Sequence, residues 1–141
     1  MDAPTFGVKE AEDSLKIFFA PWVHSLGLKP VGFDKTGGDF VLPHNPALVH
    51  KGGIVCGQAT ASTADTAAVV TLAAMNGRFR MNTTVDLSTK FIRPLPPGDI
   101  SVRAEVLSNG RKMAFVRVDM RAADDSRVAV TATMSFAYLE D

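Results

Sequence analysis

One segment limits the possible folds of this chain more than any other. Residues 52–77, GGIVCGQATASTADTAAVVTLAAMNG, form a long run of small and apolar residues bounded by glycines. The alanine-rich composition favours a helix, and Asn76-Gly77 suits a C-terminal cap. We therefore predict a central helix over about residues 54–76. Because this helix is apolar on nearly every side, other elements must enclose it.

The period of the sequence changes after this helix. Residues 79–139 alternate apolar and polar side chains with a period of two, which is typical of β-strands. The turn sequences PPGD, SNGR and ADDSR divide this part into four strands, and Asn-Gly is a strong hairpin signal. Strands joined in this way predict an antiparallel meander. The first strand is expected to have two faces, with Thr83, Val85, Leu87, Thr89 and Phe91 on one and Asn82, Thr84, Asp86, Ser88 and Lys90 on the other.

The N-terminal part predicts a helix followed by two short strands. Residues 8–26 carry apolar side chains at helical spacing, and Pro21 is expected to kink this helix or split it in two. Residues 29–43 predict two strands around a turn at Thr36-Gly37-Gly38. The apolar face expected on the N-terminal helix consists of Leu15, Phe18, Phe19, Trp22, Val23 and Leu26.

Length and composition indicate one α+β domain over residues 1–141, in which a curved antiparallel sheet wraps around the central helix. The 15 basic residues balance the 15 acidic ones, and this lack of a basic excess argues against a nucleic-acid partner. A single cysteine, Cys56, and an acidic N-terminus without a signal-peptide core favour the cytoplasm. Asp65 and Gln58 make the apolar segment a poor membrane span.

Asp65 is the one acidic residue of the apolar segment. A carboxylate is costly to bury, so it needs partners or a chemical role. Burial without compensation raises the pKa of an aspartate from about 3.9 toward neutral pH, where it can exchange a proton with a substrate. Two structural alternatives remain open at this point. Asp65 either accepts hydrogen bonds from Thr83, Thr84 or Ser62, or caps a shorter helix that starts at Thr66.

Four sequence stretches, in this order, resemble the hotdog-fold thioesterases of the phenylacetic-acid type. They are HKGGIVCGQATASTADTA, NTTVDLSTKFIRPLPPGD, SNGRKMAFVRVDM and VAVTATMSF, and they cover most of residues 44–138. The resemblance implies an α+β hotdog fold, in which a curved antiparallel sheet surrounds a central helix. It also implies homodimers that often pair into tetramers, and hydrolysis of acyl-CoA thioesters with no metal or cofactor.

The resemblance also assigns roles to individual residues. Asp65 matches the family's carboxylate, which acts as general base or nucleophile, and Gly57 matches a glycine whose N–H polarises the thioester carbonyl. Thr84 matches a residue that helps to hold the attacking water, and His50 a position where some relatives have asparagine near the thioester.

The chain departs from the family pattern just before the central helix. Where relatives have His-Gly-Gly, this chain reads Cys56-Gly57-Gln58, so His50 or Gln58 is the candidate to replace the histidine. In the family, basic residues at the rim often contact the phosphates of coenzyme A, although each one singly also fits a solvated surface charge. The expected substrate contacts are Asn45, Thr83, Arg93, Arg111 and Lys112.

The spacing of two of these residues predicts a site shared by two chains. Gly57 and Asp65 are eight residues apart, which is about 12 Å along a helix. Both can act on one carbonyl only if they come from different subunits of a twofold dimer. Two other functions stay open: a hydratase or dehydratase that uses His50 with Asp65, and an acyl-CoA-binding module without catalysis.

Overall fold

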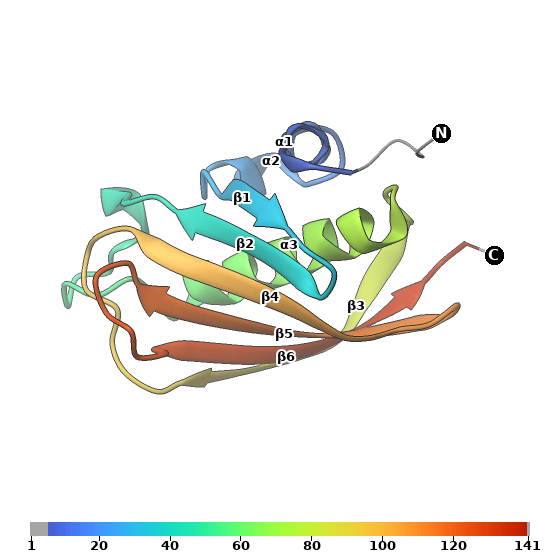
Figure 1. Cartoon of the computed structure of the whole chain (residues 1–141). Coiled ribbons are helices and arrows are strands. Elements are labelled where there is room, and N and C mark those ends of the chain that lie inside the picture. Colours follow the sequence, from blue (N-terminus) through green and yellow to red (C-terminus); the bar gives the residue numbers. More distant parts are fainter. Residues whose placement is uncertain (1–5, 141) are drawn as a thin grey trace.

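A computed structural model describes residues 6–140 of the chain. Six antiparallel strands in the order β1-β2-β4-β5-β6-β3 form one curved sheet, and the long helix α3 lies against its inner face (Figure 1). The predicted arrangement of a long helix held by an antiparallel sheet is therefore confirmed. The elements are α1 (Val8–Ile17), α2 (Pro21–His24), β1 (Lys29–Phe33), β2 (Gly37–Leu42), the 3-10 helix η1 (Pro46–Leu48), α3 (Gly57–Asn76), β3 (Asn82–Phe91), β4 (Ile100–Asn109), β5 (Met113–Ala122) and β6 (Val130–Tyr138).

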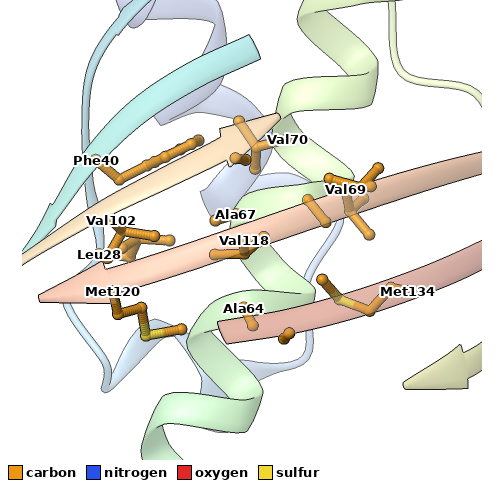
Figure 2. Close-up of a cluster of buried hydrophobic side chains, with 14 of the residues drawn as sticks. Leu28, Phe40, Ala64, Ala67, Val69, Val70, Val102, Val118, Met120 and Met134 are labelled. Atoms are coloured by element: carbon orange, nitrogen blue, oxygen red, sulfur yellow. The ribbon is translucent and has the colours of Figure 1, made fainter. Parts of the chain in front are cut away.

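Helix α3 is the centre of the core. Twelve of its 20 residues are buried, and it starts three residues later than predicted. It ends as predicted, because Gly77 has a φ of 77° and forms the left-handed cap. Figure 2 shows Phe40, Val102, Val118, Met120 and Met134 of the sheet around Ala64, Ala67 and Val70 of the helix.

Two adjacent glycines let β2 approach its neighbours closely. A Cβ atom on Gly37 would lie 1.9 Å from the carbonyl oxygen of Ala104, and one on Gly38 would lie 2.9 Å from the Thr71 hydroxyl of α3. A larger residue at Gly37 would therefore displace the backbone of β4, and one at Gly38 would displace the side chains of Phe33 and Thr71. The sequence placed these glycines in a turn, which is wrong because both lie within β2. The turn precedes them, where the Asp34 carboxylate accepts hydrogen bonds from the backbone N–H groups of Thr36 and Gly37 at 2.9 Å each.

Strands β4, β5 and β6 form the predicted meander, but β3 does not belong to it. Strand β3 pairs with β6 at the edge of the sheet, and β4 pairs with β2 and β5. The PPGD sequence therefore lies in a crossing connection rather than a hairpin turn. The segment between β3 and β4, residues 92–99, carries three prolines, which restrict the backbone and cannot donate ladder hydrogen bonds. Such a segment is poorly suited to a tight hairpin.

A β-bulge at Val85 changes the faces of β3. Thr84 pairs with Phe136 and Asp86 pairs with Ser135, so Val85 is the extra residue. The bulge shifts the alternation by one position. Thr84 consequently shares the inner face with Leu87 and Phe91, whereas Thr83 lies on the outer face. The predicted grouping of Thr83 with Leu87 and Phe91 is wrong for this reason.

Pro21 splits the predicted N-terminal helix into α1 and α2, and it is the first residue of α2. Helix α1 packs on β1 and α3 at one edge of the sheet (Figure 1). The predicted apolar face is only partly buried, because the side chains of Phe18 and Trp22 are 48% and 62% exposed. The change of direction after Ile17 breaks the single helical face on which that prediction depended.

Candidate active site

Asp65 lies half-buried in the middle of α3 and has a side-chain partner on β3. The hydroxyl of Thr84 donates a hydrogen bond to Asp65 Oδ1 at 2.7 Å. Two effects oppose each other at this carboxyl group. Burial raises the pKa of Asp65 above its usual value, and the hydrogen bond from Thr84 lowers it.

This geometry decides between the structural alternatives for Asp65. Asp65 does not cap a shorter helix, because α3 starts at Gly57 and is continuous through this position. Of the three expected hydrogen-bond partners, Thr84 makes the contact. Thr83 lies on the other face of β3.

The side of α3 that carries Asp65 is uncovered along only half of its length. Gln58, Ala61, Ser62 and Asp65 recur at three- and four-residue spacing, so they share one side of the helix, and each is exposed or half-buried. We call these four residues the open stripe. Further along the same side, Leu72 is 1% exposed. Asp65 therefore lies between the uncovered part and the buried part of this side.

The start of α3 opens into a pocket of about 320 Å³. Its wall includes Gly57, His50, Arg93 and Phe91, and its floor includes the buried residues Leu95 and Val130. A Cβ atom on Gly57 would lie 3.2 Å from Cζ of Phe91, so the tip of this ring touches the glycine. Free N–H groups at a helix start attract negative charge, and the first turn of α3 contains no acidic residue.

Three predicted site residues already have hydrogen-bond partners within the chain, and two of them, His50 and Arg93, line this pocket. His50 Nδ1 accepts a hydrogen bond from the backbone N–H of Gly52 at 2.8 Å. Arg93 Nε donates to the carbonyl of Val128 at 3.1 Å. Asn45 caps η1, with its Oδ1 accepting from the N–H of Ala47 at 3.0 Å.

The basic residues predicted to contact phosphate lie at two ends of α3. Arg93 lines the pocket at the helix start. Arg111 and Lys112 lie in the β4–β5 turn. The carbonyl of Arg111 accepts a hydrogen bond at 3.0 Å from Arg80, which follows the end of α3 and stacks 3.6 Å above the Tyr138 ring. A helix of 20 residues is about 30 Å long, so one chain does not bring these cations together.

One chain also does not bring Gly57 and Asp65 close together. Both lie on α3, about 12 Å apart along its axis. Gln58 is exposed on the open stripe between them. Phe91 was not predicted as a site residue. The available signal was its position at the end of the first predicted strand, two residues before the predicted substrate contact Arg93.

The chain belongs to the thioesterase superfamily, whose family model matches residues 52–139, more than half of the chain. Solved structures with the same hotdog fold confirm the predicted fold class. A conserved protein from Pseudomonas aeruginosa is 25% identical, with a TM-score of 0.77, over 86% of this chain and 95% of that one. A thioesterase from Haemophilus influenzae is 15% identical, with a TM-score of 0.81, over 92% and 90% of the two chains. Zebrafish thioesterase superfamily member 2 is 18% identical, with a TM-score of 0.82, over 93% and 97%.

The comparison with curated proteins finds no match. Within residues 6–140, no helix combines the length and the apolar character that a membrane crossing requires.

Proposed function

We propose that this protein is a thioesterase of the phenylacetic-acid type, which hydrolyses a small, medium-chain or aryl acyl-CoA to the free acid and coenzyme A. The observation that carries the proposal is the half-buried Asp65 carboxylate, held by Thr84 on the same uncovered side of α3 that begins at Gly57. Family membership supports thioester hydrolysis as the reaction. The single cysteine, Cys56, supports a cytoplasmic location.

In this proposal the working unit is a homodimer. The open stripe runs from Gln58 to Asp65 and is centred near Ala61, whose small side chain allows a second helix to approach closely. Two antiparallel copies of α3 that cross at Ala61 would place Gly57 of one copy beside Asp65 of the other. Each dimer then has two composite sites, and pairs of dimers would form the tetramers expected from the resemblance.

The free edge of β3 supports the same assembly. Its side chains Val85, Leu87 and Phe91 are 58%, 40% and 59% exposed. Apolar side chains on an unpaired edge strand are unusual in a monomer, because such an edge pairs readily with another chain. Pairing between two β3 strands would satisfy the free backbone groups of this edge and continue the sheet across the dimer.

The mechanism uses one group from each copy. The thioester oxygen binds at the Gly57 N–H, where the helix start stabilises the negative charge that develops on it. Asp65 of the other copy either takes a proton from a water that attacks the carbonyl carbon, or attacks this carbon itself to give a mixed anhydride that water then cleaves. In both routes the C–S bond breaks and coenzyme A leaves as a thiolate. Arg93, Arg111 and Lys112 are the proposed contacts of its phosphates.

Thiol release from a panel of acyl-CoA esters, including aryl esters, tests this function. We expect wild-type protein to release thiol and Asp65→Asn to lose most of this turnover while it still binds the ester. Asp86→Asn, which removes an exposed carboxylate one residue beyond the bulge of β3, is the matched control and should keep wild-type turnover. Near-normal turnover by Asp65→Asn, or full activity in a strictly monomeric form, would exclude the proposed site.

A further inference from the structure

The outer face of the sheet, which points away from α3 (Figure 1), has two unlike parts. In the first part, charged side chains follow one another across the strands, because Asp39 pairs with Arg103 and Arg103 pairs with Asp119. The Arg103 guanidinium binds the carboxylates of Asp39 at 3.2 Å and Glu105 at 2.8 Å. Ion pairs of this kind are typical of a surface in contact with water.

The second part of the outer face is apolar. Phe115, Met81 and Leu139 are 43%, 53% and 62% exposed. Met113 pairs with Ala137 two residues before Phe115, and the backbone N–H of Leu139 donates to the carbonyl of Met81 at 2.8 Å. We call these five residues the outer patch. Contiguous exposed apolar side chains of this number mark an interaction site rather than an ordinary monomer surface.

Two β-bulges enlarge the apolar area at the level of Phe115. Phe115 pairs with Ser135, and the extra residues Leu107 of β4 and Val85 of β3 lie at the ladder positions on either side of this pair. Leu107 and Val85 are 54% and 58% exposed. Exposed apolar side chains therefore extend from the outer patch toward both neighbouring strands.

Large and small side chains alternate between the two central strands of this area. Phe115 and Met113 of β5 lie beside the small residues Ser135 and Ala137 of β6. A twofold axis parallel to the strands, between β5 and β6, would place β5 of one copy on β6 of another. Each large side chain would then meet a small one, as sheets that pack face to face require.

The charged part of the outer face is complementary under the same axis. Lys90 of β3 lies in one row with Arg103 of β4, because the successive cross-strand pairs are Lys90–Thr131, Thr131–Asp119 and Asp119–Arg103. Arg103 is ion-paired to three carboxylates, so this group has a net negative charge. The axis exchanges β3 with β4 and brings the exposed Lys90 of one copy toward the acidic group of the other.

We propose that the outer patch is a contact between two copies of this chain, in which β5 of each copy packs on β6 of the other. The patch supplies the apolar core of the contact, and the charged part supplies its polar rim. This contact goes beyond the dimer of the proposed function, which uses β3 and the side of α3 on the opposite face of the sheet. Only the expected total of four chains rests on that dimer.

The mass of the full chain in solution tests the contact. We expect four chains per particle for the wild type in sedimentation velocity, and two for Phe115→Lys, which should weaken the contact by at least about 30-fold. Leu107→Lys is a second variant with the same expected result. Val31→Lys is the matched control, because Val31 is 59% exposed at the charged part of the outer face and should keep four chains. Circular dichroism checks that each variant is folded.

A mixing experiment tests the twofold arrangement. Phe115→Lys and Ser135→Asp should each give two chains per particle when alone. In an equimolar mixture, the new lysine of one copy would face the new aspartate of the other, and four chains should form again. A mixture that stays at two chains would overturn this arrangement.

Equal masses for the wild type and Phe115→Lys would overturn the proposal. Two chains for the wild type and one for Phe115→Lys would support the outer contact and refute the β3 dimer instead. Phe115→Lys should also keep wild-type kcat in thiol release, since Asp65 and the pocket at Gly57 lie on the other side of the sheet. Wild-type protein that forms four chains but releases no thiol from any ester would refute the hydrolysis and leave the outer contact standing.

Discussion

Replacement of Thr84 by valine removes the hydroxyl that donates to Asp65 Oδ1 at 2.7 Å, and it keeps the shape of the side chain. A hydrogen bond to a charged group contributes about 1.5–3 kcal/mol. Because Thr84 is exposed and Asp65 is half-buried, the lower end of this range applies. The loss of this bond therefore removes about 1.5 kcal/mol of stabilisation from the ionised form of Asp65.

The direction of the change follows from the two opposing effects on Asp65. Burial raises the pKa of this carboxyl group, and the Thr84 hydroxyl lowers it by stabilising the ionised form. Without the hydroxyl only the raising effect remains, so the pKa of Asp65 increases further. If the ionised carboxylate is the active form, the acid limb of the kcat/KM profile moves to higher pH in Thr84→Val.

The assay is the pH profile of thiol release, measured from the acid limb to the plateau for the wild type and three variants. Thr84→Ser keeps a hydroxyl and should retain the wild-type profile. Thr83→Val changes the neighbouring threonine on the outer face of β3 and should also leave the acid limb in place. A Thr84→Val profile that superimposes on the wild type, or that moves to lower pH, would refute this account of Asp65.

Three further predictions concern stability. Because the folded-state pKa of Asp65 is raised above its unfolded value, the ionised form costs stability at neutral pH, and this cost disappears below the unfolded pKa of about 3.9. Asp65→Asn should therefore be more stable than the wild type at neutral pH and equally stable at low pH in urea unfolding; lower stability at neutral pH would contradict this. The Thr71 hydroxyl is buried without a hydrogen-bond partner, so Thr71→Val should raise the free energy of unfolding by about 1 kcal/mol, and a decrease would show that the hydroxyl is satisfied. Gly37→Ala places Cβ 1.9 Å from the Ala104 carbonyl and should lower the midpoint of thermal unfolding by at least about 5 °C; an unchanged midpoint would show that β2 can move away.

The sequence predicted those parts of the fold that depend on local pattern. The apolar stretch of α3 and its Gly77 cap are properties of neighbouring residues, and the alternation in β4, β5 and β6 directly reflects which face is buried. The pairing of β3 with β6 could not be predicted in the same way, since it depends on contacts between segments far apart in the chain. The bulge at Val85 had no recognisable signal, because an extra residue in a strand changes the partner register rather than the local composition.

In the candidate site, too, the residues with a local signal could be predicted, and the contacts between distant segments could not. Asp65 stood out in the sequence because a carboxylate in an apolar helix is unusual, and the resemblance supplied roles for Gly57 and Thr84. The contact between Phe91 and Gly57 depends on how β3 crosses the start of α3, and the hydrogen bond that holds the His50 ring depends on one backbone N–H in a loop. Neither arrangement leaves a periodic mark in the sequence.

The bulge divides β3 into two parts, and each part aligns a different side chain with helix α3. The part before Val85 sets the height of Thr84 against Asp65, and the part after it sets the height of Phe91 against Gly57. Deletion of Val85 would leave the partners on both sides unchanged, whereas an insertion between Asp86 and Phe91 would turn one of these two side chains away from the helix. The tolerance of β3 to changes in length should therefore be concentrated at a single residue.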